Sequence, residues 1–197
     1  MKFLSKYLCV FLLLFSISSK AQLNTDSLSK VWNDLTQDQS SRLNAVNSVI
    51  MSLKSTKADS AMLLADSMYS YAKQYINFPY MAKALNLKGN CLAVLNRNTD
   101  ALQYYRKSLK IYIDINDTSG IITENNNIGI LYNKSGKTED ALNIYYENRK
   151  LSQVTSDTLG LISSNINIAY LIEKKDYDSS TILLNQAYES SKHLSPQ

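Results

Sequence analysis

The chain repeats itself every 40 residues, and this period constrains its fold more than any other feature of the sequence. Placed in register, the repeats share residues at several positions: Gly89 with Gly129, Ala61 with Ala101 and Ala141, Asp100 with Asp140, and Tyr105 with Tyr145. The connecting segments follow the same spacing, since Asp117 and Gly120 recur as Asp157 and Gly160. A fixed period in this range indicates stacked copies of one supersecondary unit, each burying its apolar face against the next.

Each repeat is predicted to form two helices. The second helix carries an apolar and aromatic stripe at helical spacing, made by Ala101, Leu102, Tyr105, Leu109 and Tyr112 and, one period later, by Ala141, Leu142, Tyr145 and Tyr146. Asp117 and Asp157 are the predicted N-caps of two first helices, and Thr138 is the predicted N-cap of a second helix. Glu139 and Asp140 would then lie in its first turn, where carboxylates favour the positive end of the helix dipole.

Two glycines fall inside the predicted first helices, at Gly89 and Gly129. Glycine within a helix costs about 1 kcal/mol relative to alanine, so a structural reason is needed. We expect a neighbouring helix to approach closely there. Ala169 keeps the equivalent position small in the last repeat.

The repeat resembles the tetratricopeptide repeat family. In one repeat the likeness is carried by Gly129, Tyr132, Gly136, Ala141 and Tyr145, with Asn148 in place of a final small residue. In the preceding repeat the equivalent residues are Gly89, Leu92, Asn96, Ala101, Tyr105 and Ser108. In the last repeat they are Ala169, Ser180, Leu184 and Ala187, and the turn is one residue shorter. The likeness covers about 42–194, and in the first repeat only the second helix, over 59–74, carries it. It implies an all-α, right-handed solenoid of antiparallel helix pairs with about four repeats over 42–197, after an N-terminal helix near 27–35 and a linker within 22–41.

The N-terminus has the features of a secretory signal peptide over 1–21. Lys2 and Lys6 precede an unbroken apolar run over 8–15, and Ser19 and Ala21 are the small residues that a signal peptidase reads, with cleavage before Gln22. The run is far shorter than the ~20 residues needed to span a bilayer. We therefore expect an exported protein, periplasmic or secreted, with no stable membrane span after cleavage.

Removal of this segment changes the charge balance. Three of the 21 basic residues lie in 1–21, which leaves 18 against 17 acidic residues. A chain so close to neutral gives no support for nucleic-acid binding. Only Cys91 remains after cleavage, so no internal disulfide can form and packing alone must hold the fold.

A narrower likeness involves the N-terminal part. The segments that carry it are Asp26-Ser27-Leu28, Val31-Trp32-Asn33-Asp34, Arg42-Leu43-Asn44-Ala45 and Asp59-Ser60-Ala61. They are similar to the head of bacterial sensors in which a periplasmic tetratricopeptide array precedes a transmembrane helix and an output domain: an adenylate or guanylate cyclase, a histidine kinase or a DNA-binding regulator. This likeness implies a detached or truncated sensing part that acts in signal transduction.

The sequence offers little for catalysis. LYNKSGKT over 131–138 ends like a phosphate-binding loop, but that pattern requires glycine where Leu131 stands, and Gly129 is two residues too early. The equivalent turns do not keep this motif, so Lys137 is expected to point into water. His193 is predicted to lie on the surface of the last turn and Cys91 in the core. No cluster has metal-ligand spacing. We expect no enzyme, no metal and no cofactor.

Asparagine, a poor helix former, is unusually frequent in the predicted first helices: Asn86, Asn90, Asn125, Asn126, Asn127, Asn165 and Asn167. Two interpretations remain open. In the favoured interpretation these amides bond between neighbouring helices, and in the other they form a ladder that binds a partner's backbone. The family resemblance implies a concave groove for a peptide or protein partner, with these contact residues: Lys83, Asn86, Asn90, Asn126, Ile130, Asn133, Lys134 and Tyr170.

Some relatives in that family clamp a terminal carboxylate with lysines and asparagines. Only Lys83, Asn90 and Asn127 match parts of that clamp, and Thr123 and Ser163 stand where lysine would be expected. The clamp is therefore not carried over to this chain.

The last predicted helix, over 177–194, has an apolar surface where solenoids usually end in a polar one. The residues concerned are Ile182, Leu183, Leu184, Ala187 and Tyr188. This pattern predicts either self-association through the C-terminal helix or a missing continuation of the array.

Overall fold

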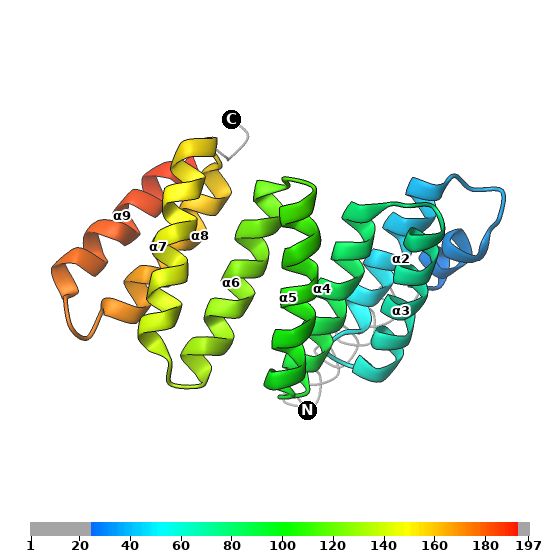
Figure 1. Cartoon of the computed structure of the whole chain (residues 1–197), viewed down its shortest axis with the longest axis horizontal. Coiled ribbons are helices and arrows are strands. Elements are labelled where there is room, and N and C mark those ends of the chain that lie inside the picture. The colour runs from blue at the N-terminus through cyan, green and yellow to red at the C-terminus, as the bar shows by residue number, and fades with distance from the viewer. Residues whose placement is uncertain (1–24, 193–197) are drawn as a thin grey trace, which may run out of the picture. The chain divides into compact units, whose positions relative to one another are not determined.

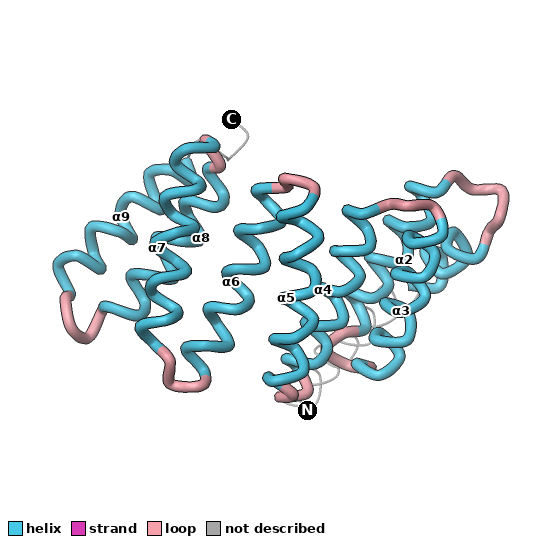
Figure 2. Tube along the Cα trace, in the orientation of Figure 1, coloured by secondary structure: helices cyan, strands magenta, loops and turns pink. Residues whose placement is uncertain are grey.

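The computed structural model describes residues 25–192, and nearly all of them are helical (Figures 1 and 2). A short helix over 25–33 precedes α2 (Gln39–Leu53), α3 (Ala58–Gln74), α4 (Phe78–Val94), α5 (Asn98–Asp114), α6 (Thr118–Lys134), α7 (Thr138–Thr155), α8 (Thr158–Ile172) and α9 (Tyr177–Lys192). No strand occurs among these residues. The predicted fold class, an all-α solenoid of antiparallel helix pairs, is confirmed. The predicted signal peptide, His193 and the end of the last predicted helix lie outside the described residues.

The helix starts reproduce the sequence period. Helices α3 to α8 begin 20 residues apart, at Ala58, Phe78, Asn98, Thr118, Thr138 and Thr158, so a pair of helices occupies 40 residues. Helix α9 begins at Tyr177, one residue earlier than this spacing requires, which confirms the prediction that the turn of the last repeat is one residue shorter.

The turns between helices follow one backbone pattern. Five residues with positive φ stand at the same 20-residue spacing: Ile76, Asn96, Asn116, Gly136 and Ser156. After Gly136, the N–H of Lys137 donates to the Tyr132 carbonyl at 2.9 Å, so α6 ends in a Schellman motif. These turns are among the short pink segments of Figure 2.

The residue after each left-handed position is the N-cap of the next helix. At the first helices of the repeats it is Asn77, Asp117 or Asp157, and each side chain accepts from a backbone N–H three residues on. The predicted caps Asp117 and Asp157 are confirmed, with 2.9 Å to the N–H groups of Gly120 and Gly160.

The predicted cap at Thr138 is wrong, because α7 begins differently from the first helices, as do α3 and α5. Thr138 is already the first helical residue of α7, and Lys137 holds the cap position without a side-chain hydrogen bond. The chain leaves α6 through Gly136 so tightly that the carbonyl of Lys137 already accepts from the Ala141 N–H at 3.1 Å. Lys57 and Arg97, at the equivalent positions, likewise make no side-chain cap.

The chain divides into two compact units, with the boundary between Asn96 and Arg97 in the turn after α4. In unit 1, α3 packs against α2 and α4. Its core is aliphatic, and the fully buried side chains include Leu43, Val46, Ile50, Met68 and Cys91.

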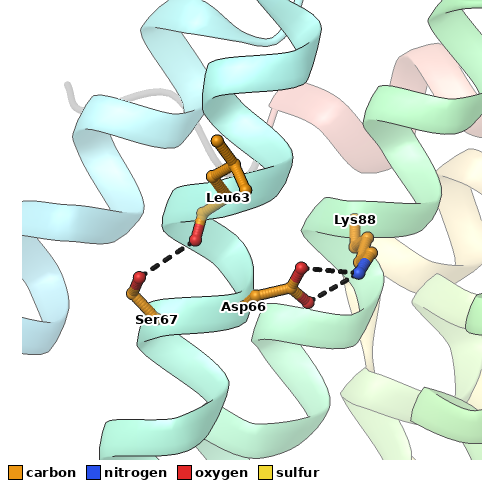
Figure 3. Close-up of polar contacts among 4 residues, drawn as sticks. All are labelled: Leu63, Asp66, Ser67 and Lys88. Atoms are coloured by element: carbon orange, nitrogen blue, oxygen red, sulfur yellow. Dashed lines mark hydrogen bonds and ion pairs between the residues drawn. The ribbon is translucent and has the colours of Figure 1, made fainter.

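Aromatic and charged contacts at the edges of unit 1 tie its helices together. The Arg42 guanidinium lies 4.5 Å from the Tyr71 ring centroid and 5.4 Å from that of Trp32, and its Nε donates to the Trp32 carbonyl at 2.9 Å. This contact fastens the 25–33 helix to α2 and α3. On the outer side, Lys88 of α4 pairs with Asp66 of α3 at 2.6 Å (Figure 3).

In unit 2, α6 packs against α5 and α7, and α8 packs against α7 and α9. The core around α7 contains Ala141, Tyr145, Ile168 and Ala169. A Cβ at Gly129 would lie 2.6 Å from Tyr145 Cε1, so the close approach predicted at this glycine is confirmed.

Candidate functional site

A groove of about 570 Å³ lies between α6 and α8 in unit 2. Both helices contribute their N-terminal halves, and the groove is lined by Ser119, Ile122, Thr123, Asn126, Asn127, Asp157, Leu159, Gly160, Ile162, Ser163 and Ile166. It is the exposed face of two first helices one repeat apart, which is where the family resemblance places ligand contacts.

The two helix N-termini are fixed by side chains packed against glycine. The Tyr112 ring occupies the space that a Cβ of Gly120 would need, and the Ser152 hydroxyl does the same at Gly160. Burial, with the carboxylates of Glu124 and Asp117 nearby, raises the pKa of Tyr112, so its hydroxyl stays protonated there even in moderately alkaline solution. The two walls of the groove are therefore set by packing from α5 and α7.

A chain of amides runs beneath the groove and joins three helices. Asn148 of α7 is fully buried; its Nδ2 donates to the Ile122 carbonyl and to Asn126 Oδ1, both at 3.0 Å. Asn125 Nδ2 donates back to Asn148 Oδ1 at 3.0 Å. Asn126 Nδ2 then donates to Ser163 Oγ of α8 at 3.1 Å. Because amide hydrogen bonds are directional, this network holds α6 and α8 at one spacing.

The walls of the groove combine apolar and uncharged polar side chains. Leu159 is 67% exposed and Ile166 is 45% exposed, both on α8, while Thr123 and Asn127 of α6 offer hydroxyl and amide groups. Asp157 is the one charged residue among the lining residues, and its carboxylate already caps α8. The groove thus suits an uncharged segment and provides no cation for a carboxylate.

The predicted contact residues are distributed over both units. Asn126 lines the groove and also belongs to the amide network. Ile130, Lys134 and Tyr170 are exposed on the C-terminal halves of α6 and α8, beyond the groove. Asn133 is half-buried and accepts from Thr138 Oγ1 at 3.3 Å.

The other three predicted contact residues lie on α4 in unit 1. Lys83 Nζ is 5.8 Å from the ring centroid of Tyr80. Asn90 Nδ2 donates to Asn86 Oδ1 at 2.9 Å, one helical turn away. These two asparagines therefore pair with each other along one helix.

The favoured interpretation of the asparagines is confirmed for Asn125, Asn126 and Asn167, which all bond to residues of another helix. Residues of the groove that sequence reasoning did not propose as contacts include Ser119, Ile122, Thr123, Leu159, Ile162 and Ile166. They recur every three to four residues along each helix, so the sequence alone could have shown them as a stripe on one face of each helix. The central amide, Asn148, was recognised only as a departure from a small residue.

Among the described residues weighed for catalysis, neither Cys91 nor Lys137 belongs to a reactive cluster. Cys91 is buried, and burial raises the pKa of its thiol, so little of the nucleophilic thiolate forms at neutral pH. Lys137 is exposed, as predicted. Within 25–192, no group of histidine, cysteine and acidic residues could hold a metal ion. In the same stretch, every helix is too short or too polar to cross a membrane.

Comparison with known proteins identifies the fold but no family. No protein-family model and no curated protein matches the sequence. Among solved structures, BtubC (BKLC) from P. vanneervenii superposes with a TM-score of 0.66 at 14% identity, covering 89% of this chain and 74% of BtubC. MamA superposes with a TM-score of 0.55 at 12% identity, covering 89% of this chain and 94% of MamA. The chain has a tetratricopeptide-like helical repeat fold.

Proposed function

We propose that this protein is an exported, non-enzymatic scaffold that binds a peptide or a partner domain through the exposed faces of its first helices. The observation that carries the proposal is the α6–α8 groove, in which hydrogen-bonding and apolar side chains alternate above a rigid amide network. Preorganisation of this kind favours binding because little side-chain entropy remains to be lost.

The lining of the groove indicates the chemistry of the bound segment. Asn127 can donate to and accept from a peptide backbone. Thr123 can accept from it, because its hydroxyl already donates to the Ser119 carbonyl at 2.9 Å, and Leu159 and Ile166 can contact its apolar side chains. With no lysine or arginine among the lining residues, an extended and uncharged segment fits better than an acidic one. Ile130 and Tyr170 extend the exposed face of the same helices, and Lys83, Asn86 and Asn90 would serve unit 1 in the same way.

The test is crosslinking and mass spectrometry in intact cells that produce the full chain. The double variant Leu159→Glu with Ile166→Glu places two charges in the groove, and we expect it to lose the partner that the wild type captures. Val154→Glu is the matched control, because Val154 is 77% exposed on α7 and lies outside the groove. Capture of the same partner by the double variant would remove the groove from the proposal.

The predicted contacts of unit 1 need a separate variant. Asn86→Ala combined with Asn90→Ala removes the paired amides of α4 while leaving the amide network of unit 2 intact. Reduced capture would include α4 in the binding face, and unchanged capture would restrict binding to unit 2.

The alternative is a detached or truncated periplasmic sensor region that acts in signal transduction. It rests on the N-terminal likeness to sensor proteins and on no contact in the structure. An adjacent reading frame that begins with a transmembrane helix and continues into a cyclase, kinase or regulator domain would favour it. Copurification with such a protein would test it directly.

Export and self-association complete the proposal. N-terminal sequencing of protein from the cell envelope should begin at Gln22, and an intact Met1 would argue against cleavage.

The side chains of Ile182, Leu184 and Tyr188 on α9 are exposed and could meet in a second copy. Sedimentation analysis should show an association that Leu184→Glu abolishes; a strictly monomeric wild type would exclude this contact.

A further inference from the structure

A second pocket in unit 2 shares no lining residue with the α6–α8 groove. It has a volume of about 610 Å³ and takes Arg149 and Gln153 from α7, Leu161 and Asn165 from α8, and Ile182 and Gln186 from α9 among its walls. Three helices thus meet around a cavity that is large enough for a small organic group.

Two buried polar atoms at this pocket lack a hydrogen-bond partner within the described residues. One is Oδ1 of Asn165, a residue that is only 1% exposed, and the other is Nε of Arg149. The far end of the same guanidinium is held, because its NH2 donates to Gln186 Oε1 at 3.3 Å. Leaving such groups unsatisfied weakens a fold, so native structures do it rarely and usually for a reason.

The two atoms are complementary in what they require. Arg149 Nε is a donor that needs an acceptor, and Asn165 Oδ1 is an acceptor that needs a donor. A carboxylate would suit Arg149 and repel the oxygen of Asn165, whereas an ammonium group would suit Asn165 and face a guanidinium. The other charged lining residue, Glu189, is already paired with Lys192 at 2.7 Å. An amide supplies both an acceptor and a donor without net charge.

We propose that the α7–α8–α9 pocket binds an amide group, whose carbonyl accepts from Arg149 Nε and whose N–H donates to Asn165 Oδ1. Leu161 and Ile182 provide apolar surface for the carbon atoms beside the amide, and Gln153 adds a further hydrogen-bonding side chain. The amide can come from the backbone of an extended partner segment or from a carboxamide side chain. This site is independent of the α6–α8 groove and of the function proposed for that groove.

The test is NMR titration of the full chain with three small probes. N-methylacetamide represents a peptide bond, propionamide represents a carboxamide side chain, and acetate represents an anion. Both amides, or one of them, should shift the Arg149 Nε–H and Asn165 side-chain signals saturably, and the amide that binds more tightly identifies the source. Equal or stronger binding of acetate would overturn the proposal, as would signals that none of the probes moves.

Variants separate a binding site from a packing defect. Asn165→Leu removes the buried acceptor, so it should stabilise the free protein and weaken amide binding by about tenfold. Arg149→Lys keeps the charge and removes Nε, so it should weaken binding similarly even if the first variant folds poorly. Unchanged binding in either folded variant would reject the site.

The groove variant Leu159→Glu with Ile166→Glu is the control here. It should leave the amide titration unchanged, because the two cavities have no residue in common. A loss of amide binding in this control would mean that the probes bind in the groove instead, which would also reject the proposal.

Discussion

Unit 1 and unit 2 are built from the same helix-pair repeat but bury different kinds of side chain. The buried core of unit 1 is aliphatic, with Leu43, Val46, Ile50 and Met68 among its members. All the buried polar side chains of the described residues lie in unit 2: Ser108, Glu124, Asn148, Ser152, Ser164, Asn165 and Ser180. The same architecture therefore has an apolar interior in one unit and a partly polar interior in the other.

The difference can be followed at single repeat positions. One position holds Met68 in unit 1 and Ser108 and Asn148 in unit 2, and all three are buried. Another holds Ala84, then Glu124 in unit 2. Ser108 Oγ donates to Glu124 Oε1 at 2.9 Å, so a polar residue on one helix is matched by a polar residue on its neighbour.

This comparison shows which features the repeat requires and which it leaves free. Small residues and turn geometry recur in both units, because they determine how closely helices can approach. The chemistry of the interior can vary, and buried polar residues of unit 2 such as Ser108 and Asn148 bond to polar groups of a neighbouring helix. Apolar packing tolerates small shifts, whereas amide networks need one arrangement, which is why the preorganised groove lies in unit 2.

The largest expected effect comes from moving the polar residue into unit 1. Met68→Asn should lower the free energy of unfolding by about 4 kcal/mol, because it leaves a cavity and buries an amide in an apolar cluster. Urea denaturation followed by circular dichroism measures this, with Met68→Leu as the volume-conserving control at under ~1.5 kcal/mol. Equal costs for the two variants would break the distinction between the interiors.

The reverse exchange should cost less. Asn148→Met should lower the free energy of unfolding by about 2–3 kcal/mol, since the Ile122 carbonyl and the amides of Asn125 and Asn126 lose partners while apolar volume is gained. Asn143→Met, on the exposed surface of α7, is the control and should change stability by less than ~0.5 kcal/mol. A stabilising Asn148→Met would mean that the network is not required for the fold.

Alkaline pH should destabilise unit 2 through its buried tyrosines. Burial raises the pKa of Tyr145 from 10.0 to about 12, so its contribution is complete below pH 10 and is lost as the pH rises towards 12. The loss should approach about 2 kcal/mol. Urea denaturation across this pH range measures the fall in the free energy of unfolding. Tyr145→Phe should remove the part of this fall that Tyr145 causes, whereas Tyr75→Phe, at an exposed position of unit 1, should leave the fall unchanged.

The smallest effect is expected at the polar contact on the outside of unit 1. Asp66→Asn removes the charge that Lys88 meets at 2.6 Å, and because Asp66 is largely exposed the cost should stay below about 1 kcal/mol. Denaturation at low and at high salt measures it, since screening should reduce the difference further. A cost comparable to that of Asn148→Met would show that surface pairs matter as much as buried ones.

The helices and their caps could be predicted because their causes are local. Asp117 lies three residues before the N–H that it accepts from, and Asp157 repeats this geometry. The same local reasoning failed at Thr138, where the tight exit from α6 moves the start of the helix back by one residue. Of the contact residues predicted on α6 and α8, Asn126 lines the groove, whereas Ile130, Asn133, Lys134 and Tyr170 lie further along the two helices.

The groove could not be located from the sequence, since its position along α6 and α8 depends on how the two helices pack. The partners of the amide network are equally distant in sequence: Asn125 meets Asn148 across 23 residues, and Asn126 meets Ser163 across 37. No periodicity distinguishes an asparagine that faces a neighbouring helix from one that faces solvent.

The sequence by itself determined the 40-residue repeat, the helix pairs and their first-helix caps, because these follow from contacts within a few residues of one another. Only the tertiary structure decided which amides bond between helices, where the groove and the α7–α8–α9 pocket lie, and which polar atoms at that pocket stay unsatisfied. Those features arise when side chains from separate helices are packed together, and hydrogen-bond geometry then allows only some of them to find partners.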